Sequence, residues 1–315
     1  MTLQSDHPDA ADATEAGDRA RAARAADRAG APDAVDQTEV VKPAGVVEPA
    51  GVVESAGVVE SAGVAGVAAT DRTERTGLGR AADVAERVRA VLQAADPDAV
   101  WAVGGPDGLH TGSAAGGDGS PLDVGGLMPV LALWPVIGSL VAEEALRLHT
   151  PLTAYGTEAP AGTTAHHLLS HSTGPAAQAA LTRLAEHLTG SPLAELAATR
   201  IWHPLGMTGT RFADGTLRAP LADLVRFLSH LLSPADHPVS RAWITESLRI
   251  RTGELTPARG LLWHPAPHGT WAYGETPTAW VSPRLHRWAL LLPTHPPGPL
   301  RQTFRDAAFD PTPAP

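Results

Sequence analysis

Two hydroxyl groups flank an imidazole at Ser170, His171 and Ser172. A histidine beside a serine can accept the hydroxyl proton, which makes the oxygen a nucleophile for acyl transfer. Side chains adjacent in sequence rarely point at one another, however, and no acidic residue lies nearby in the sequence to orient the ring. These residues therefore predict at most a weak serine esterase or peptidase activity.

Two further groups of histidines are candidates for a metal site: His166 and His167 with His171, and His264 with His268. Zinc sites usually combine imidazole with carboxylate or thiolate ligands. Neither group contains Asp or Glu, and isolated histidines are more often surface or core residues. The sequence therefore predicts no metal site and no cofactor.

The composition excludes several kinds of chemistry. The absence of cysteine rules out disulfides, zinc-thiolate sites and a cysteine nucleophile. Lys42 is the only lysine, and there is no asparagine. With 34 acidic and 24 basic residues, the chain offers no basic patch for nucleic acid or for anionic lipid.

No membrane span and no secretory signal are predicted. Residues 124–142 carry no charge over nearly the length of a membrane span, but prolines and glycines interrupt them. This pattern favours a core helix of a soluble domain. The first 18 residues have neither a basic region nor an apolar core, which indicates no export signal. The location remains open, with the cytoplasm as the default.

Three regions are predicted along the chain. Residues 1–78 are acidic, rich in alanine and free of aromatic residues, which is typical of a disordered tail. Within them, residues 43–66 repeat the hexapeptides PAGVVE and SAGVVE, which we interpret as a low-complexity linker rather than a short β-solenoid. Residues 79–296 form the folded domain. Residues 297–315 are expected to be a loose, proline-rich tail.

The folded domain is predicted to be α+β. Apolar spacing predicts helices, and alternation with turn signals predicts strands. The expected helices are 80–95, 127–148, 177–190, 191–202, 219–232 and 239–250, and the expected strands are 99–105, 109–115, 259–265, 269–274, 278–283 and 287–294. Strands at both ends of the domain with helices between them predict one sheet built from both ends.

Two blocks, HHLLSHSTGP (166–175) and IWHPLGMTGTRF (201–212), resemble signatures of the serine β-lactamase and penicillin-binding-protein-like family. This is the group of class C β-lactamases, D,D-carboxypeptidases and esterases, and the resemblance extends over residues 80–296. It implies an antiparallel sheet flanked by helices, with a reduced helical subdomain. It also implies an acyl-enzyme mechanism with a serine and a lysine one helical turn apart.

The residues that this mechanism needs are missing. Alignment of residues 122–148 with the family places Gly126 at the nucleophile and Pro129 at the lysine. Because Lys42 is the only lysine and is followed by proline, no Ser-x-x-Lys or Lys-Thr-Gly exists in any register. The family's Tyr-x-Asn motif needs an asparagine, and Ala272-Tyr273-Gly274 stands at its Lys/His-Thr-Gly strand. The chain is thus predicted to be a degenerate member.

Other conspicuous residues are expected to have structural roles. Leu168, Leu169, Leu205 and Met207 are predicted core residues, Asp214 a turn residue and Asp223 a helix-surface residue. His110-Thr111-Gly112 spells the strand motif but lies in the first hairpin, so we do not assign it to the site.

Two prolines bear on the long helix. Pro129 is tolerated in a first helical turn, where its missing N–H has no partner to lose. Pro135 either kinks the helix or delays its start to about residue 134.

Three functional hypotheses follow. The first is a non-catalytic pseudoenzyme that binds a peptide, a cell-wall fragment or a protein partner in the remnant cleft, which includes residues 272–274. The second is a weak serine hydrolase that uses Ser170 or Ser172 with His171. The third is the product of a decaying gene, which the missing motifs and the repeats would fit.

Overall fold

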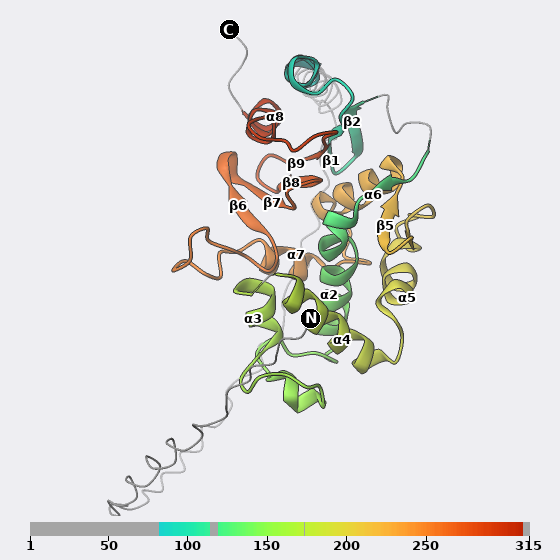
Figure 1. Cartoon of the computed structure of the whole chain (residues 1–315), viewed down its shortest axis with the longest axis vertical. Helices are drawn as coiled ribbons and strands as arrows, with labels where there is room; N and C mark the ends of the chain where they lie inside the picture. The colour runs from blue at the N-terminus through green and yellow to red at the C-terminus, as the bar shows by residue number, and fades with distance from the viewer. Residues whose placement is uncertain (1–81, 114–118, 173, 311–315) are drawn as a thin grey trace, which may run out of the picture. The chain divides into compact units, whose positions relative to one another are not determined.

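A six-stranded antiparallel sheet joins the two ends of the folded domain in the computed structural model, which describes residues 82–113, 119–172 and 174–310 (Figure 1). The strand order is β2-β1-β9-β8-β7-β6. The strands are β1 (Val100–Gly105), β2 (Gly108–Gly112), β6 (His264–Ala266), β7 (Thr270–Tyr273), β8 (Thr278–Ser282) and β9 (Arg287–Leu292). The predicted α+β fold with a sheet built from both ends is confirmed. The predicted tail 1–78, with its repeats, lies outside the described residues.

The two faces of this sheet bury two separate hydrophobic clusters. Successive side chains of a strand point to opposite faces. On β1, Trp101 and Val103 accordingly belong to one cluster and Ala102 to the other. On β9, Leu291 joins the first cluster and Leu290 the second. The sheet therefore needs cover on both sides.

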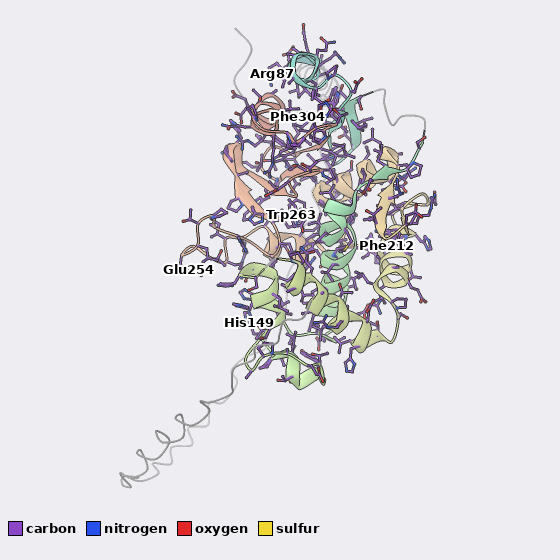
Figure 2. All side chains as sticks on the ribbon, viewed as in Figure 1. Arg87, His149, Phe212, Glu254, Trp263 and Phe304 are labelled. Carbon is purple, nitrogen blue, oxygen red and sulfur yellow. The ribbon has the colours of Figure 1, made fainter. Side chains whose placement is uncertain are left out.

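Two terminal helices cover the first face: residues 82–95 and α8 (Leu300–Phe309), which lie near one another in Figure 1. The first helix buries Val84, Val88 and Leu92, as its spacing predicted. From α8, the Phe304 ring lies 6.5 Å from that of Trp101 and 5.7 Å from that of Trp280 (Figure 2). The first cluster thus brings the N- and C-terminal parts of the domain together.

The expected proline-rich tail is therefore corrected, since residues 297–315 include α8. Pro299 takes the N-cap position of α8, where the missing N–H of proline costs no helical hydrogen bond. Leu300, Phe304, Ala308 and Phe309 then recur at helical spacing and are buried. The prolines before the helix obscured this amphipathic pattern.

The second face is covered by helices from the middle of the chain, with α6 (Leu221–Leu232) against β1, β2 and β9. The other helical segments on this side of the domain are α2 (Trp134–Ala142), α3 (Ala165–Ser170), α4 (Pro175–Thr189), α5 (Leu193–Ala197) and α7 (Arg241–Ser247). The short 3-10 segments are η1 (Gly125–Leu127), η3 (Leu152–Tyr155) and η5 (Pro267–Gly269). A small sheet of order β3-β5-β4 is formed by β3 (Leu122–Asp123), β5 (Thr216–Ala219) and β4 (Arg211–Ala213).

The long central helix begins with a π-helical turn, η2 (Pro129–Leu133), and continues as α2. In a regular α-helix the N–H of residue 135 would donate to the carbonyl of Leu131, but Pro135 has no N–H. That carbonyl accepts instead from the indole N–H of Trp202 at 2.8 Å. Trp202 ends a second π-helical turn, η4 (Ala198–Trp202). The proline thus causes neither a break nor an unsatisfied carbonyl, and α2 begins at Trp134.

One predicted strand is mostly wrong. Of residues 259–265, only the last two belong to β6. Leu261, Leu262 and Trp263 are fully buried in an irregular segment, and Leu262 has a φ of 69°. Burial by the surrounding elements, rather than strand pairing, explains why this stretch is apolar. No helix among the described residues is long and apolar enough to span a membrane.

The contribution of α8 can be tested with Phe304→Ala. Because Phe304 is completely buried between two tryptophans, we expect a loss of about 3–5 kcal/mol in the free energy of unfolding. Urea denaturation followed by circular dichroism measures it. Gln302→Ala, an exposed position on the same helix, is the control and should change stability by less than about 0.5 kcal/mol. Equal effects of the two substitutions would contradict the assigned role of α8.

Candidate active site

The position aligned with the nucleophile, Gly126, lies in η1 directly before the central helix. A β-carbon on Gly126 would lie 2.7 Å from the carbonyl oxygen of Thr276 and 3.2 Å from Cδ of Pro277. Backbone atoms that close to a β-carbon require the chain to shift. The turn between β7 and β8 therefore occupies the space into which a side chain at Gly126 would extend.

The position aligned with the lysine, Pro129, is the first residue of η2 and is buried. Its ring stands where the N–H of the first helical turn has no intrahelical acceptor. The fold therefore accepts a proline here, but no amine is present to activate a hydroxyl.

The strand segment expected to line the cleft lies beside this helix start. A β-carbon on Gly274, which has a φ of 82°, would lie 2.3 Å from the carbonyl oxygen of Pro277 and 3.0 Å from Cδ2 of Leu127. The structure thus brings the end of β7 and the start of the helix together. The close approach of the turn also leaves only glycine acceptable at residue 274.

Of the other two residues of this segment, Ala272 points to the face of the sheet covered by α8, and Tyr273 to the opposite core. The Tyr273 hydroxyl accepts a hydrogen bond from Nε2 of Gln178 at 3.5 Å. Burial raises the pKa of Tyr273 well above its usual range. The phenol is protonated at neutral pH, so it cannot serve as a general base.

The expectation for Ser170 and His171 is corrected in two respects. The side chains do meet, with Oγ of Ser170 2.8 Å from Nδ1 of His171. An acid is also present, since Nε2 of His171 lies 3.2 Å from Oε1 of Glu254. Glu254 lies in the segment between α7 and β6 (Figure 2) and is far from His171 in sequence. Nothing in the local sequence could have indicated this contact.

This Ser-His-Glu chain is nevertheless closed to substrate. Ser170 has no exposed surface. Its hydroxyl also donates to the backbone carbonyl of His166 at 2.7 Å, which competes with the imidazole for the single proton. The arrangement holds the end of α3 to the loop that carries Glu254, and its serine cannot reach an acyl carbon.

Ser172 is exposed and pairs with a different histidine. Its Oγ lies 3.2 Å from Nε2 of His167, whose ring stacks on that of His171 at 5.0 Å. Among the described ion pairs, none joins a carboxylate to His167. Ser172 and His167 therefore form an accessible pair that lacks a group to orient the imidazole.

The histidines around α3 form a cluster rather than a ligand set. The rings of His149 and His166 lie 4.5 Å apart, and those of His166 and His171 lie 6.3 Å apart. Burial, together with the charges of His149 and Arg251, lowers the pKa of His166. No group of three or more histidines and carboxylates within the described ranges has a metal-binding arrangement.

The second signature block, which contains Met207, is held in place by Asp223, and this corrects the expectation of a helix-surface role. Asp223 is only 2% exposed. Its Oδ2 accepts from the N–H of Gly209 and the hydroxyl of Thr210, each at 2.9 Å, and its Oδ1 accepts from Arg226 at 2.8 Å. The carboxylate therefore fixes the loop after Met207 onto α6. Met207, Leu168 and Leu169 are buried as predicted, whereas Leu205 is half-buried.

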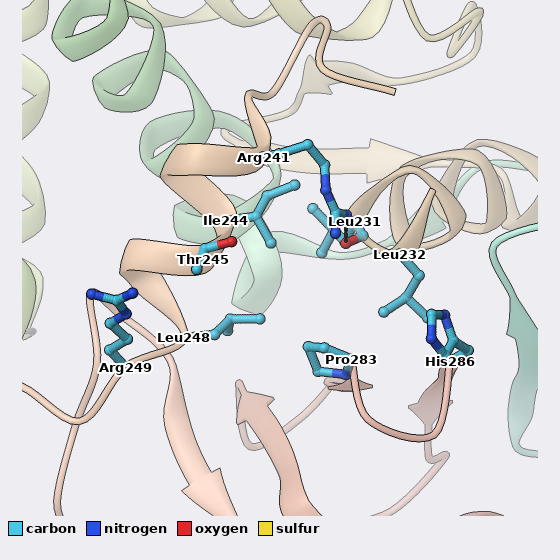
Figure 3. Close-up of a pocket in the computed structure, with 9 residues that line it drawn as sticks. All are labelled: Leu231, Leu232, Arg241, Ile244, Thr245, Leu248, Arg249, Pro283 and His286. Atoms are coloured by element: carbon cyan, nitrogen blue, oxygen red, sulfur yellow. Dashed lines mark hydrogen bonds between the residues drawn. The ribbon is translucent and has the colours of Figure 1, made fainter. Parts of the chain in front are cut away.

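A cavity of about 220 Å³ lies between α6, α7 and the turn from β8 to β9 (Figure 3). Its arginines already have partners. Arg241 donates to the carbonyls of Leu231 at 3.4 Å and Ser233 at 2.8 Å, and Arg249 forms an ion pair with Glu246 at 2.9 Å. Both arginines are thus engaged by groups of the protein itself.

No known protein-family profile and no curated protein sequence matches this chain. Solved structures do match. A β-lactamase from Mycobacterium bovis aligns with a TM-score of 0.57 and 21% identity, over 71% of this chain and 94% of that protein. An octameric penicillin-binding protein homologue from Pyrococcus abyssi aligns with a TM-score of 0.57 and 14% identity, over 72% of this chain and 76% of that protein. A D-stereospecific amidohydrolase from Streptomyces aligns with a TM-score of 0.55 and 15% identity, over 73% of this chain and 99% of that protein.

These neighbours are serine hydrolases of the β-lactamase and penicillin-binding-protein-like group. The antiparallel sheet with its flanking helices corresponds to the fold of these neighbours. This chain has the β-lactamase/transpeptidase-like fold, as the two signature blocks predicted.

The role of Asp223 predicts a clear difference between two Asp→Asn substitutions. Asp223→Asn places an NH2 donor where the carboxylate accepts hydrogen bonds, and it removes the ion pair with Arg226. We therefore expect a loss of about 1–3 kcal/mol in the free energy of unfolding. Asp214→Asn, at an exposed turn with a φ of 52°, should have almost no effect because asparagine tolerates this conformation. Urea denaturation compares the two variants. If Asp223→Asn were as stable as the starting protein, the anchoring role would be wrong.

Proposed function

We propose that this chain is a non-catalytic homologue of the serine hydrolases whose fold it shares, and that it acts by binding rather than by acyl transfer. The observation that carries this proposal is the first turn of the central helix. Gly126 has no side chain, the Thr276 carbonyl lies where one would extend, and Pro129 replaces the amine. The ligand class that we propose for the remnant cleft is a peptide, a cell-wall fragment or a protein partner.

The positions of the remaining candidate groups support this proposal. The tyrosine nearest to the family's strand motif is buried and protonated. Ser170 is inaccessible, and Ser172 has a histidine without an orienting acid. Acyl transfer needs an accessible nucleophile, a base and donors that stabilise the oxyanion, all within reach of one carbonyl carbon. No described set of side chains here combines these features.

The alternative is a weak serine esterase or peptidase, and the contact of Ser170 and His171 with Glu254 is the observation that favours it. Covalent labelling of the full chain distinguishes the two functions. We expect a fluorescent penicillin, a fluorophosphonate and a chromogenic ester to leave no adduct detectable by mass spectrometry. Labelling that disappears in Ser172→Ala or Ser170→Ala would overturn the non-catalytic proposal.

The same preparation tests the third hypothesis, that of a decaying gene product. A folded chain is expected to unfold cooperatively in urea and to show saturable binding of a muropeptide or peptide library without acylation. A chain that neither folds nor binds would support decay instead. The labelling experiment therefore tests for catalysis, and the urea unfolding experiment tests whether the chain forms a stable fold.

Restoring the two family residues should not restore catalysis. In Gly126→Ser combined with Pro129→Lys, the new β-carbon meets the Thr276 carbonyl, so we expect no labelling by the fluorescent penicillin. Gly126→Ala is the matched control for space alone, and should lower stability by about 1–3 kcal/mol because the turn must shift. A fully stable Gly126→Ala variant together with labelling of the double variant would show that the turn does not block the site.

A further inference from the structure

Residues 251–259 form a loop between α7 and β6, and the base of this loop is held against α3. The N–H of its first residue donates to the carbonyl of its last at 2.7 Å, which closes the loop. Arg259 also donates from its guanidinium to the carbonyl of His171 at 3.0 Å, and the N–H of Leu262 donates to the carbonyl of Leu169 at 2.7 Å. None of these hydrogen bonds uses a group that titrates near neutral pH, so the base contacts do not respond to pH there.

The loop reaches the same helix end a second time through Glu254, an exposed residue (Figure 2). Its Oε1 lies 3.2 Å from Nε2 of His171, and Nδ1 of the same ring lies 2.8 Å from Oγ of Ser170. We call Ser170, His171 and Glu254 the latch. Unlike the base contacts, the latch contains an imidazole, whose charge changes readily between about pH 5 and pH 8.

The hydrogen bonds of the latch require a proton at each of three positions. Oγ of Ser170 lies 2.7 Å from the carbonyl oxygen of His166, and two oxygens this close require the hydroxyl proton between them. With that proton used, the contact between Oγ and Nδ1 requires a proton on Nδ1. The carboxylate of Glu254 only accepts, so its contact requires a proton on Nε2. All three hydrogen bonds form together only when His171 carries both ring protons, that is, as the imidazolium.

A neutral His171 ring loses one of these hydrogen bonds. With its proton on Nδ1, the lone pair of Nε2 faces the carboxylate of Glu254, which is repulsive. With its proton on Nε2, the hydroxyl of Ser170 must turn to Nδ1, and two oxygens then face each other at 2.7 Å without a proton. In either form the closed latch is less stable. Glu254 is exposed and can move into solvent, whereas Ser170 has no exposed surface and stays in place.

Several cations and imidazoles surround the latch, but only one carboxylate contacts an imidazole there. The groups on α3 and on the segments packed against it are His149, His166, His167, Arg251 and Arg259. Arg251 is already paired with Glu246. Within the described residues, none of the other three histidines forms an ion pair, whereas His171 faces Glu254. A proton taken up by this group of rings is therefore best accommodated on His171.

The neighbouring ring of His166 favours its neutral form. Burial lowers the pKa of His166, and the charges of His149 and Arg251 lower it further. The centre of this ring lies 6.3 Å from that of His171, so a second positive charge there would oppose the first. The latch is therefore most stable where His171 holds a proton and His166 does not.

We propose that the latch is a pH-sensitive switch, in which protonation of His171 closes loop 251–259 onto the end of α3 and loss of the proton releases Glu254. The sign follows from linkage. The closed form binds one proton more than the open form, so closing is favoured as the pH falls and is lost as the pH rises. Because Glu254 is exposed, the ion pair is modest and the effect is confined to the loop. In the closed form Ser170 accepts a hydrogen bond from the ring, which is the reverse of what a nucleophile requires.

Amide hydrogen exchange of the full chain, followed by mass spectrometry, measures the opening of the loop. The protection factor corrects each rate for the intrinsic exchange rate at that pH, so values at different pH can be compared. For peptides that cover residues 252–258, we expect protection factors about fivefold higher at pH 6.0 than at pH 8.0. This increase corresponds to one exposed ion pair and one hydrogen bond gained on protonation.

Two matched variants test whether the latch causes this difference. Glu254→Gln removes the charge but keeps the length and an acceptor oxygen, so the difference between the two pH values should fall below about twofold. Glu195→Gln is the control, because this exposed carboxylate belongs to α5 and lies outside the latch, and it should keep the full difference. Both positions are exposed, so we expect both variants to fold, and urea denaturation checks that they do.

Ring ¹⁵N spectra provide a second, independent measurement. At pH 6.0 both ring nitrogens of His171, identified by the signals that are missing in His171→Gln, should carry protons. A neutral ring at pH 6.0 would overturn the proposal. So would an increase in protection below about twofold, greater protection at pH 8.0, or a full pH difference in Glu254→Gln. None of these results depends on the labelling experiments, so the switch and the non-catalytic proposal can fail separately.

Discussion

The pairing of β1 with β9 is the interaction on which the domain depends. It places Trp101 opposite Leu291 and Val103 opposite Ala289, and thus joins segments from the two ends of the folded chain. Because side chains alternate across these strands, the same pairing creates two hydrophobic faces. One face must be covered by the terminal helices, and the other by the middle of the chain. The positions of α6, α8 and the central helix all follow from this requirement.

The packing of the central helix does not depend on the residues at its first turn. Leu131, Ile137 and Leu140 are buried, and the Leu131 carbonyl is satisfied by Trp202. These interactions stabilise the helix whatever side chain stands at its first turn. At that turn the constraints are different, because a β-carbon at residue 126 would collide with the Thr276 carbonyl and a proline is acceptable at residue 129. Packing thus stabilises the body of the helix, whereas the close approach of Thr276 constrains residue 126 at its start.

The polar groups of this domain serve mainly to hold loops. The carboxylate of Asp223 orders the loop after Met207, and the contact of Ser170 with His171 and Glu254 ties α3 to a distant segment. A buried carboxylate or hydroxyl is stable only when its hydrogen bonds are made. In both cases the donors and acceptors are other parts of the chain. Geometry that resembles catalysis can thus arise from the need to satisfy buried polar atoms.

Much of the fold could be predicted from the sequence. Apolar spacing in residues 80–95 and 177–190 predicted helices that the structure confirms, and the two signature blocks indicated the β-lactamase-like fold. The absence of a second lysine and of any asparagine excluded the family's catalytic motifs in every register. These conclusions depend on local spacing and on composition, which do not require knowledge of contacts between distant residues.

The site needed the tertiary structure. The approach of Thr276 to Gly126, the contact of Glu254 with His171 and the hydrogen bonds of Asp223 all join residues from different elements. The helix α8 was missed because the prolines before it obscured its apolar spacing. The segment around Leu262 was predicted as a strand because its apolar residues, which pack against distant elements, resemble a strand in the local sequence. The sequence by itself determined most of the helices and strands and the absence of any Ser-x-x-Lys, Tyr-x-Asn or Lys-Thr-Gly motif. Which side chains meet, and what space remains between them, was decided only by long-range packing, because local sequence does not specify contacts across the fold.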